Sequence, residues 1–273
     1  MTACINSAFI QSLAKHRTTT QAKNLLALQV GNAVAFLAVI VTNAIAGSTK
    51  LLNGQNTADV SAHYSTLVTP AGFTFSIWGV IYVLLFVFIV FQLLPRHRQD
   101  SFNSQVGYLF ILSSIFNIAW LFLWQYDYIV ASVPMILALL ASLIAIYLRL
   151  HIGRSQVSFR EKLSVHLPFS VYLGWITIAS IADAAAALVS VNWDGFGVSP
   201  TVWALVVIVL ALIITLTVLG TRRDVAYGLV VIWALVGIAA SQGGYPEVVT
   251  TAEGGAIVTV IAVVAVALVS RLT

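Results

Sequence analysis

Long runs of apolar residues alternate with short polar segments along the whole chain. Each run is close to the roughly 20 residues that an α-helix needs to cross the hydrocarbon core of a bilayer. The pattern predicts eight spans, at about residues 25–46, 73–94, 105–124, 129–150, 163–191, 202–220, 225–240 and 255–269. We therefore expect an all-α integral membrane protein with eight transmembrane helices.

Composition points the same way. Of the 273 residues, 60% are hydrophobic and 8% are charged, whereas about a quarter of the residues in a soluble domain are charged. The pI of about 9.3 would suit a nucleic-acid partner, but the basic residues are scattered over short loops rather than gathered in one patch. The single cysteine, Cys4, supplies neither a disulfide framework nor a thiolate metal site. We expect lipid, and no nucleic acid, as a partner.

The distribution of lysine and arginine tests the number of spans, because cytoplasmic loops accumulate these residues. With the N-terminus inside, Lys50 is the one among the 13 that falls on the outer side. The inner side then holds Lys15, Arg17, Lys23, Arg96, Arg98, Arg149, Arg154, Arg160, Lys162, Arg222, Arg223 and Arg271. This asymmetry predicts an N-in and C-in topology.

Three regions follow from the pattern. Residues 1–22 are polar and are interpreted as a cytoplasmic tail, residues 23–191 as a five-helix part, and residues 192–273 as a three-helix C-terminal extension. The first span ends in Ala-Ile-Ala (44–46), which resembles a signal-peptidase site, but the span is longer than a signal h-region, which favours a retained helix. Loop 47–69 is the longest polar connection and is a candidate lid. The extension is interpreted as scaffold, oligomer face or lipid-facing cover.

An aromatic face opens the second span. Pro70 suits a first helical turn with Thr69 as its N-cap, and Phe75, Trp78 and Tyr82 then recur at i, i+3 and i+7. An aromatic belt at the membrane surface is the alternative. It explains rings near the helix entrance better than the two deeper ones, which favour a lined pocket.

Two further predicted helices carry polar and aromatic faces. The third has Ser113, Asn117, Trp120 and Trp124, and the fifth has Tyr172, Trp175, Ala179 and Asp183. Interhelical hydrogen bonds, worth about 0.6–2 kcal/mol each, are one interpretation. Taken together, the faces predict a shared cavity lined by Trp and Tyr, which suits a planar apolar ligand with polar edges.

Asp183 is the one carboxylate within a predicted span. It could bind a ligand, relay a proton or hold a cation, or it could be a capped aspartate near the interface. His63 and His166 fall on opposite sides of the membrane and make a poor metal site, so surface positions are predicted for both. Without phosphate-binding or hydrolase motifs, the sequence predicts no catalytic residues, no metal site and no required cofactor.

Three short motifs resemble a known family. Trp78 is followed by Tyr82 after a proline and glycine entry, residues 117–120 read Asn-Ile-Ala-Trp, and residues 172–175 read Tyr-Leu-Gly-Trp, followed by Ala179. Through these motifs the first five helices resemble the tryptophan-rich sensory protein family, also called the translocator protein, peripheral benzodiazepine receptor-like or TspO/MBR family. Departures are Ser76 and Val171 in place of prolines, Leu121 in place of a serine, Asp183 in place of asparagine, and the three additional helices.

The resemblance implies a five-helix bundle that binds porphyrins or other tetrapyrroles, and in some members sterols or benzodiazepine-type drugs, under the first loop. Members are often dimers and are linked to stress sensing, transport and porphyrin breakdown. The site residues that carry over are Trp78, Tyr82, Asn117, Trp120, Tyr172, Trp175, Ala179 and Asp183, to which the pattern adds Phe75 and Trp124.

We expect a multi-pass protein of a prokaryotic plasma membrane that binds a flat hydrophobic ligand, such as a porphyrin, as a sensor, carrier or receptor. The alternative from another class is a secondary transporter coupled through protonation of Asp183. A third interpretation is an enzyme that degrades tetrapyrroles.

Overall fold

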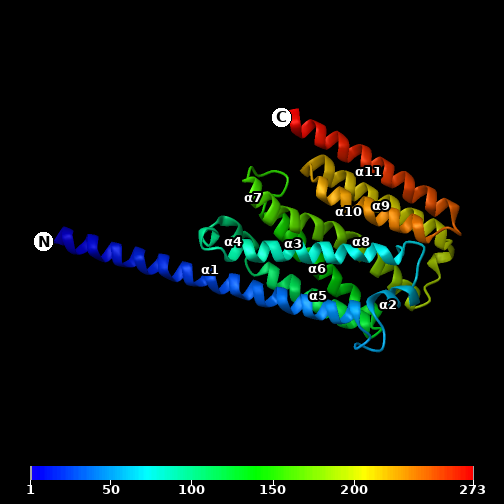
Figure 1. Ribbon diagram of the computed structural model, residues 1–273, viewed down its shortest axis with the longest axis horizontal. Coiled ribbons are helices and arrows are strands. Elements are labelled where there is room, and N and C mark those ends of the chain that lie inside the picture. The colour runs from blue at the N-terminus through cyan, green and yellow to red at the C-terminus, as the bar shows by residue number, and fades with distance from the viewer. Residues whose placement is uncertain (1, 273) are drawn as a thin grey trace.

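All eight apolar segments are helical. The computed structural model describes the backbone of residues 2–272 and the side chains of residues 24–269 (Figure 1). The predicted spans correspond, in chain order, to α1 (Thr2–Ser48), α3 (Ile77–Leu93), α5 (Leu109–Gln125), α6 (Ile129–Arg149), α8 (Leu167–Ser190), α9 (Pro200–Arg222), α10 (Val225–Ser241) and α11 (Pro246–Leu272).

Among residues 24–269, six helical segments are long and apolar enough to cross a membrane: 24–48, 72–93, 129–149, 159–190, 200–222 and 246–269. Helices α5 and α10 are also apolar but have 17 residues each, a length of about 25 Å at 1.5 Å per residue. The free ends of α1 and α11 lie toward the same end of the molecule (Figure 1), as an even number of crossings requires. Eight crossings and the N-in orientation stay predictions.

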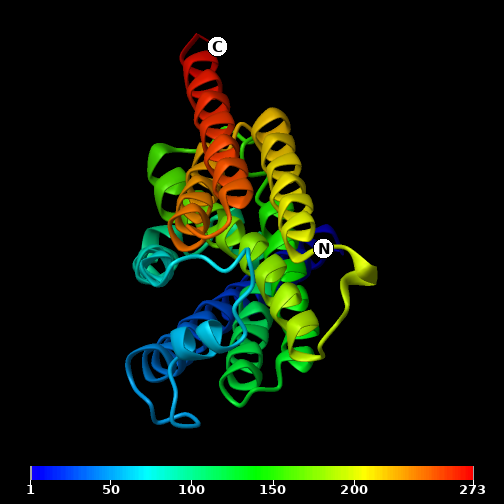
Figure 2. The ribbon, with the colours of Figure 1, turned by 90° about the vertical axis from the view of Figure 1, so that its right-hand side faces the viewer.

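Five of these helices close into a ring. Helix α1 packs against α3, α3 against α8, α8 against α6, α6 against α5, and α5 again against α1. Helices α9, α10 and α11 pack on one another as a second group, which lies to one side of the ring (Figure 2). Helix α10 makes most of the contact between the two groups, through α8. The ring therefore consists of the five helices that carry the family-like motifs.

The N-terminal tail differs from the prediction in its conformation. Helix α1 begins at Thr2 rather than near residue 25, and its first turns project beyond the bundle (Figure 1). A helix that is already nucleated adds residues at little cost, and the segment 11–23 contains several good helix formers such as Gln, Ala and Lys. The polar composition of the tail therefore did not predict where the helix starts.

The entrance to α3 also differs from the prediction. Pro70 precedes the helix instead of opening it, and a 3₁₀ turn, η1 (Gly72–Ser76), comes before α3. The Thr69 hydroxyl accepts from the Thr66 backbone N–H at 2.8 Å and caps no helix. Phe75 consequently lies in a 3₁₀ turn, while Trp78 and Tyr82 lie in α3 itself.

Short elements fill the connections. These are α2 (Thr57–His63), η2 (Pro95–His97), α4 (Ser101–Val106), α7 (Phe159–Glu161), η3 (Lys162–His166) and η4 (Gly195–Gly197). The η3 turn is a π-helix that joins α7 to α8. Pro168 follows at the start of α8, and because it has no N–H for the usual intrahelical bond, a widened turn before it is expected.

Candidate ligand-binding cavity

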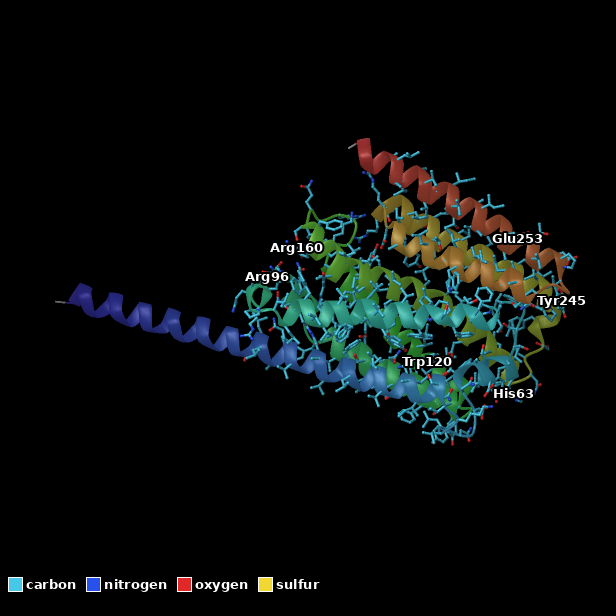
Figure 3. The ribbon with its side chains drawn as sticks, in the orientation of Figure 1. His63, Arg96, Trp120, Arg160, Tyr245 and Glu253 are labelled. Atoms are coloured by element: carbon cyan, nitrogen blue, oxygen red, sulfur yellow. The ribbon has the colours of Figure 1, made fainter. Side chains whose placement is uncertain are left out.

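A small cavity lies within the ring, close to the loops predicted to be on the outer side. Its volume is about 50 Å³. Figure 3 shows Trp120 inside the bundle, His63 of α2 near the outer end, and Arg96 and Arg160 at the other end. The lining residues come from α2, the connection to η1, α3, α5 and α8: Thr57, Ser61, Tyr64, Thr69, Pro70, Phe75, Trp78, Trp120, Trp124, Trp175, Ile178, Ala179, Ala182, Asp183 and Ala186.

Stacked aromatic rings form the main wall. Trp120 stacks on Trp124 and on Trp78, each with ring centroids 6.1 Å apart, and Trp78 stacks on Tyr82 at 5.7 Å. Trp175 meets Trp78 edge to face at 6.2 Å. These separations fall within the 4.5–7 Å range of direct aromatic pairs. We call this row of four stacked rings, from Trp124 to Tyr82, the aromatic ladder.

Asp183 lies at the side of the ladder and is 2% exposed. Its Oδ1 accepts from the Trp120 indole N–H at 3.0 Å, and the Ser132 hydroxyl lies 3.1 Å from both carboxylate oxygens. The Trp120 indole N–H thus donates to this carboxylate, and the one hydroxyl hydrogen of Ser132 can go to Asp183 or to the Ile129 carbonyl, 2.8 Å away. Ser132 brings α6 into the site. It stands one turn into its helix without an aromatic neighbour, so the sequence gives no signal for it.

Polar side chains from three helices pack behind the ladder. The Asn117 amide donates to the Tyr172 hydroxyl at 3.2 Å, and the Asn43 amide donates to Asn117 Oδ1 at 2.8 Å. The Tyr172 ring meets Trp78 at 6.2 Å. These contacts connect α1, α5 and α8 and fix the rotation of each helix about its axis. Asn117 and Tyr172 therefore position the aromatic rings without lining the cavity.

One donor at the cavity has no partner. Trp175 is 3% exposed, and its indole nitrogen forms no hydrogen bond with any described residue. A buried donor without an acceptor costs about 1–3 kcal/mol. A ligand with an acceptor atom would remove that cost, which makes Trp175 a candidate ligand contact.

Loop 47–69, the candidate lid, covers one end of the cavity, which Thr57, Ser61, Tyr64 and Thr69 line. The side-chain amides of Asn53 and Gln55 donate to the Gln125 carbonyl at 3.0 and 3.1 Å, and the Trp124 indole N–H donates to the Thr57 carbonyl at 3.4 Å. These bonds hold the lid against the end of α5.

A capping box starts the lid helix α2. Asn56 accepts from the backbone N–H of Asp59, and Asp59 accepts in return from the Asn56 N–H at 3.0 Å. The Asn56 backbone N–H and then the Lys50 ammonium, 3.1 Å away, lower the pKa of the Asp59 carboxyl. At the other end of α2, burial and then the Asp127 carboxylate raise the pKa of the Tyr64 hydroxyl.

Residues 66–74 form the opposite side of the cavity mouth, which we call the rim. Helix α10 packs against the rim and forms hydrogen bonds with it. The Trp233 indole N–H donates to the Thr74 carbonyl at 3.0 Å, and the Ala71 N–H donates to the Gly237 carbonyl at 2.9 Å. A side-chain methyl group at Gly237 would overlap the Thr74 hydroxyl, so the two backbones approach closely. Further along, hydroxyl and amide groups of α10 and its C-cap donate to rim carbonyls: Ser241 to Thr69, and Gln242 to Thr66 and Thr69.

Seven of the ten predicted site residues line the cavity together: Phe75, Trp78, Trp120, Trp124, Trp175, Ala179 and Asp183. Tyr82, Asn117 and Tyr172 lie behind them. The lid and rim residues Thr57, Ser61, Tyr64, Thr69 and Pro70 were absent from the prediction, because a loop gives no periodic signal. Ligand binding by these residues stays a prediction.

The predicted surface position of His166 is wrong. It is 5% exposed, because the π-turn rotates it into the bundle, whereas His63 is exposed as expected. At the start of α10, the Asp224 carboxylate is 6% exposed and accepts from the Tyr147 hydroxyl at 2.9 Å and from the Ser170 hydroxyl at 2.7 Å. Within residues 24–269, no three His, Cys, Asp or Glu side chains lie close enough together to hold a metal ion.

Comparison with known proteins gives one result. A family model described as "TSPO-like protein" matches residues 29–266, a range that includes the last three helices as well as the first five. No curated protein and no solved structure matches the chain. The match covers most of the chain and agrees with the resemblance of the three motifs. The chain therefore belongs to the TSPO-like family of multi-pass membrane proteins.

Proposed function

We propose that this protein binds a flat hydrophobic ligand, such as a porphyrin or another tetrapyrrole, in the cavity beside the aromatic ladder, and that it acts as a sensor or carrier. The observation that carries the proposal is the convergence of Phe75, four Trp side chains and Asp183 on one cavity. Aromatic walls with a few placed polar groups are typical of ligand sites. Family membership supports a ligand-binding or sensory role in a membrane.

The closed cavity has a volume of about 50 Å³, whereas pockets that hold drug-sized ligands are typically about 300–1,000 Å³. It is therefore far too small for a macrocycle. Binding of a tetrapyrrole therefore requires the lid to move. The lid is held by polar contacts to the end of α5, which can exchange with water when the lid opens. We infer that the ligand enters between α2 and the ladder.

Tryptophan fluorescence of the purified protein, titrated with a porphyrin, tests this function. We expect saturable quenching that weakens in Trp120→Phe and Trp175→Phe, because both side chains line the cavity. Trp193→Phe is the matched control, since Trp193 packs on Phe196 and Trp203 outside the cavity. Quenching that does not saturate, or that is equal in all three variants, would refute the proposal. Titration in the dark separates binding from photochemical loss, and turnover there would indicate a degrading enzyme.

One observation favours a second function. Asp183 is buried and, among the described residues, has no basic partner, and intramembrane acids often serve ion or proton coupling. A secondary transporter that is coupled through Asp183 would lose transport in Asp183→Asn. A binding protein would still bind porphyrin in that variant, because the amide oxygen can still accept from Trp120 and Ser132. The proposed assembly is a homodimer, and its proposed location is a prokaryotic plasma membrane.

A further inference from the structure

Among the described residues, the cavity lining contains an acidic side chain and no basic one. Asp183 is its single carboxylate, and none of the described residues that line it is Lys, Arg or His. A ligand that fits the cavity has to be compatible with a buried negative charge.

The hydrogen bonds to Asp183 leave acceptor sites open. A carboxylate has about four lone-pair sites on its two oxygens. The donors are one indole hydrogen, from Trp120, and the one hydroxyl hydrogen of Ser132, for which the Ile129 carbonyl competes, so at most about half of those sites are filled. Bulk solvent reaches little of the side chain, which is 2% exposed, and a buried carboxylate is stabilised most by a cation.

The walls around this carboxylate also attract cations. Trp is the ring that binds an ammonium or guanidinium group best, because its face is electron-rich. Trp124 and Trp175 line the same small space as Asp183, and neither ring lies between two others of the aromatic ladder. Aromatic faces plus a carboxylate are the features by which proteins recognise alkylated ammonium groups.

The size of the closed cavity agrees with such a group. One water-sized sphere needs about 10–15 Å³, so a cavity of about 50 Å³ has room for about three to five non-hydrogen atoms. This is the size of a small alkylammonium head and far below that of a macrocycle. The unpartnered Trp175 N–H can donate to an oxygen carried next to that head.

We propose that this cavity selects ligands that carry an organic ammonium group, which sits among the Trp side chains with its charge toward Asp183. The inference rests on the proposed ligand-binding function and specifies its ligand: the ammonium group occupies the space that exists in the closed state, and the flat apolar part of the ligand extends toward the lid.

Choline and its neutral isostere 3,3-dimethylbutan-1-ol test the proposal, because they differ in the charge alone and share the hydroxyl. Tryptophan emission is titrated with each compound, using protein purified in a maltoside detergent without phosphocholine lipids. We expect choline to bind at least about tenfold more tightly than the isostere. In Asp183→Asn this preference should shrink to about twofold or less.

Two controls make the result specific. Asp224→Asn removes another buried carboxylate, at the opposite end of α10 from the rim, and should leave the preference for choline unchanged. Asp183→Asn should still show saturable porphyrin quenching, which demonstrates a folded cavity. Equal binding of choline and its isostere, or an unchanged preference in Asp183→Asn, overturns the inference while porphyrin quenching persists. If the wild type binds neither porphyrin nor choline, the proposed function is refuted, and the inference is refuted with it.

An ammonium group can come from a soluble molecule or from a lipid headgroup. Repeating the choline titration in phosphatidylcholine and in phosphatidylglycerol nanodiscs separates the two sources. A response in both supports a soluble ligand, and a response in phosphatidylglycerol alone supports occupation by a choline lipid. A response in neither nanodisc contradicts the ammonium site.

Discussion

Gly237→Ala is expected to loosen the rim of the cavity. The added methyl group would overlap the Thr74 hydroxyl and lie about 3.0 Å from Thr74 Cβ, and overpacking of this kind costs about 1–3 kcal/mol. Separation of α10 from η1 would also weaken the Trp233 to Thr74 hydrogen bond, worth about 1 kcal/mol. Replacement of a helical glycine recovers about 1 kcal/mol. The expected net loss is about 1–3 kcal/mol.

Gly220→Ala is the matched control, because Gly220 also lies in a helix of the C-terminal group, and an added methyl group there meets nothing within 4 Å. It should stabilise the protein slightly, by up to about 1 kcal/mol. Unfolding of the two variants by titration with dodecyl sulfate in mixed micelles measures the difference.

Hydrogen exchange shows whether the loss is local. The Ala71 N–H, which donates to the Gly237 carbonyl, should exchange faster in Gly237→Ala, while peptides from α5 and α6 should keep their wild-type rates. Equal stability of the two alanine variants together with an unchanged rate at Ala71 would refute the argument that α10 braces the rim. Ser241→Ala combined with Gln242→Ala removes rim contacts without overpacking and should raise the same exchange rate.

Three further predictions concern polar groups in the bundle and the lid. Asn117→Leu should destabilise the protein by about 1–3 kcal/mol in the same unfolding assay, because the Tyr172 hydroxyl and the Asn43 amide lose their hydrogen-bond partner. Asn117→Asp should lose less stability than Asn117→Leu. Asp224→Ala should cost about 3–5 kcal/mol, since two hydroxyls and the N-cap of α10 depend on that carboxylate, and a cost below about 1 kcal/mol would contradict its place in the structure. The lid should respond to acid: the pKa of Asp59 is lowered from its usual 3.8 in the folded state, so its contribution to α2 is complete above about pH 4 and is lost as pH falls through the lowered pKa. The protection of amides 57–63, that is their exchange relative to the intrinsic rate at each pH, should therefore fall only below that range and should not change with pH there in Asp59→Asn.

Hydropathy predicted the positions of the helices well, because a segment in lipid must satisfy its own backbone hydrogen bonds. The residue spacing also identified faces that meet, such as Trp120 with Trp78. Such patterns show which side of a helix is buried, but not which helix covers it. The contact of Gly237 with η1 joins residues more than 160 positions apart, and a lone glycine in an apolar helix has several possible roles.

Local backbone geometry was the other gap in the prediction. A proline near the start of a helix fits two geometries equally well. One is a first α-helical turn that begins at Pro70, and the other is the 3₁₀ turn that precedes α3 in the structure. The burial of His166 depends on the π-turn before Pro168, which changes the side-chain rotation without changing the composition of the segment. Loop residues of the lid were missed because their role comes from contacts to α5 and not from periodicity.

The aromatic ladder has an optical consequence. Four of the seven Trp residues line one cavity, and three of them are joined by stacking at 6.1 Å. At this separation the electronic transitions of neighbouring indoles mix, which should produce a paired positive and negative band in the far-ultraviolet circular dichroism spectrum. A molecule that separates Trp78 from Trp120 would reduce that pair of bands to the contribution of Trp120 and Trp124, whereas one that binds elsewhere would leave it intact. The protein therefore contains its own spectroscopic marker for entry into the cavity, without any attached label.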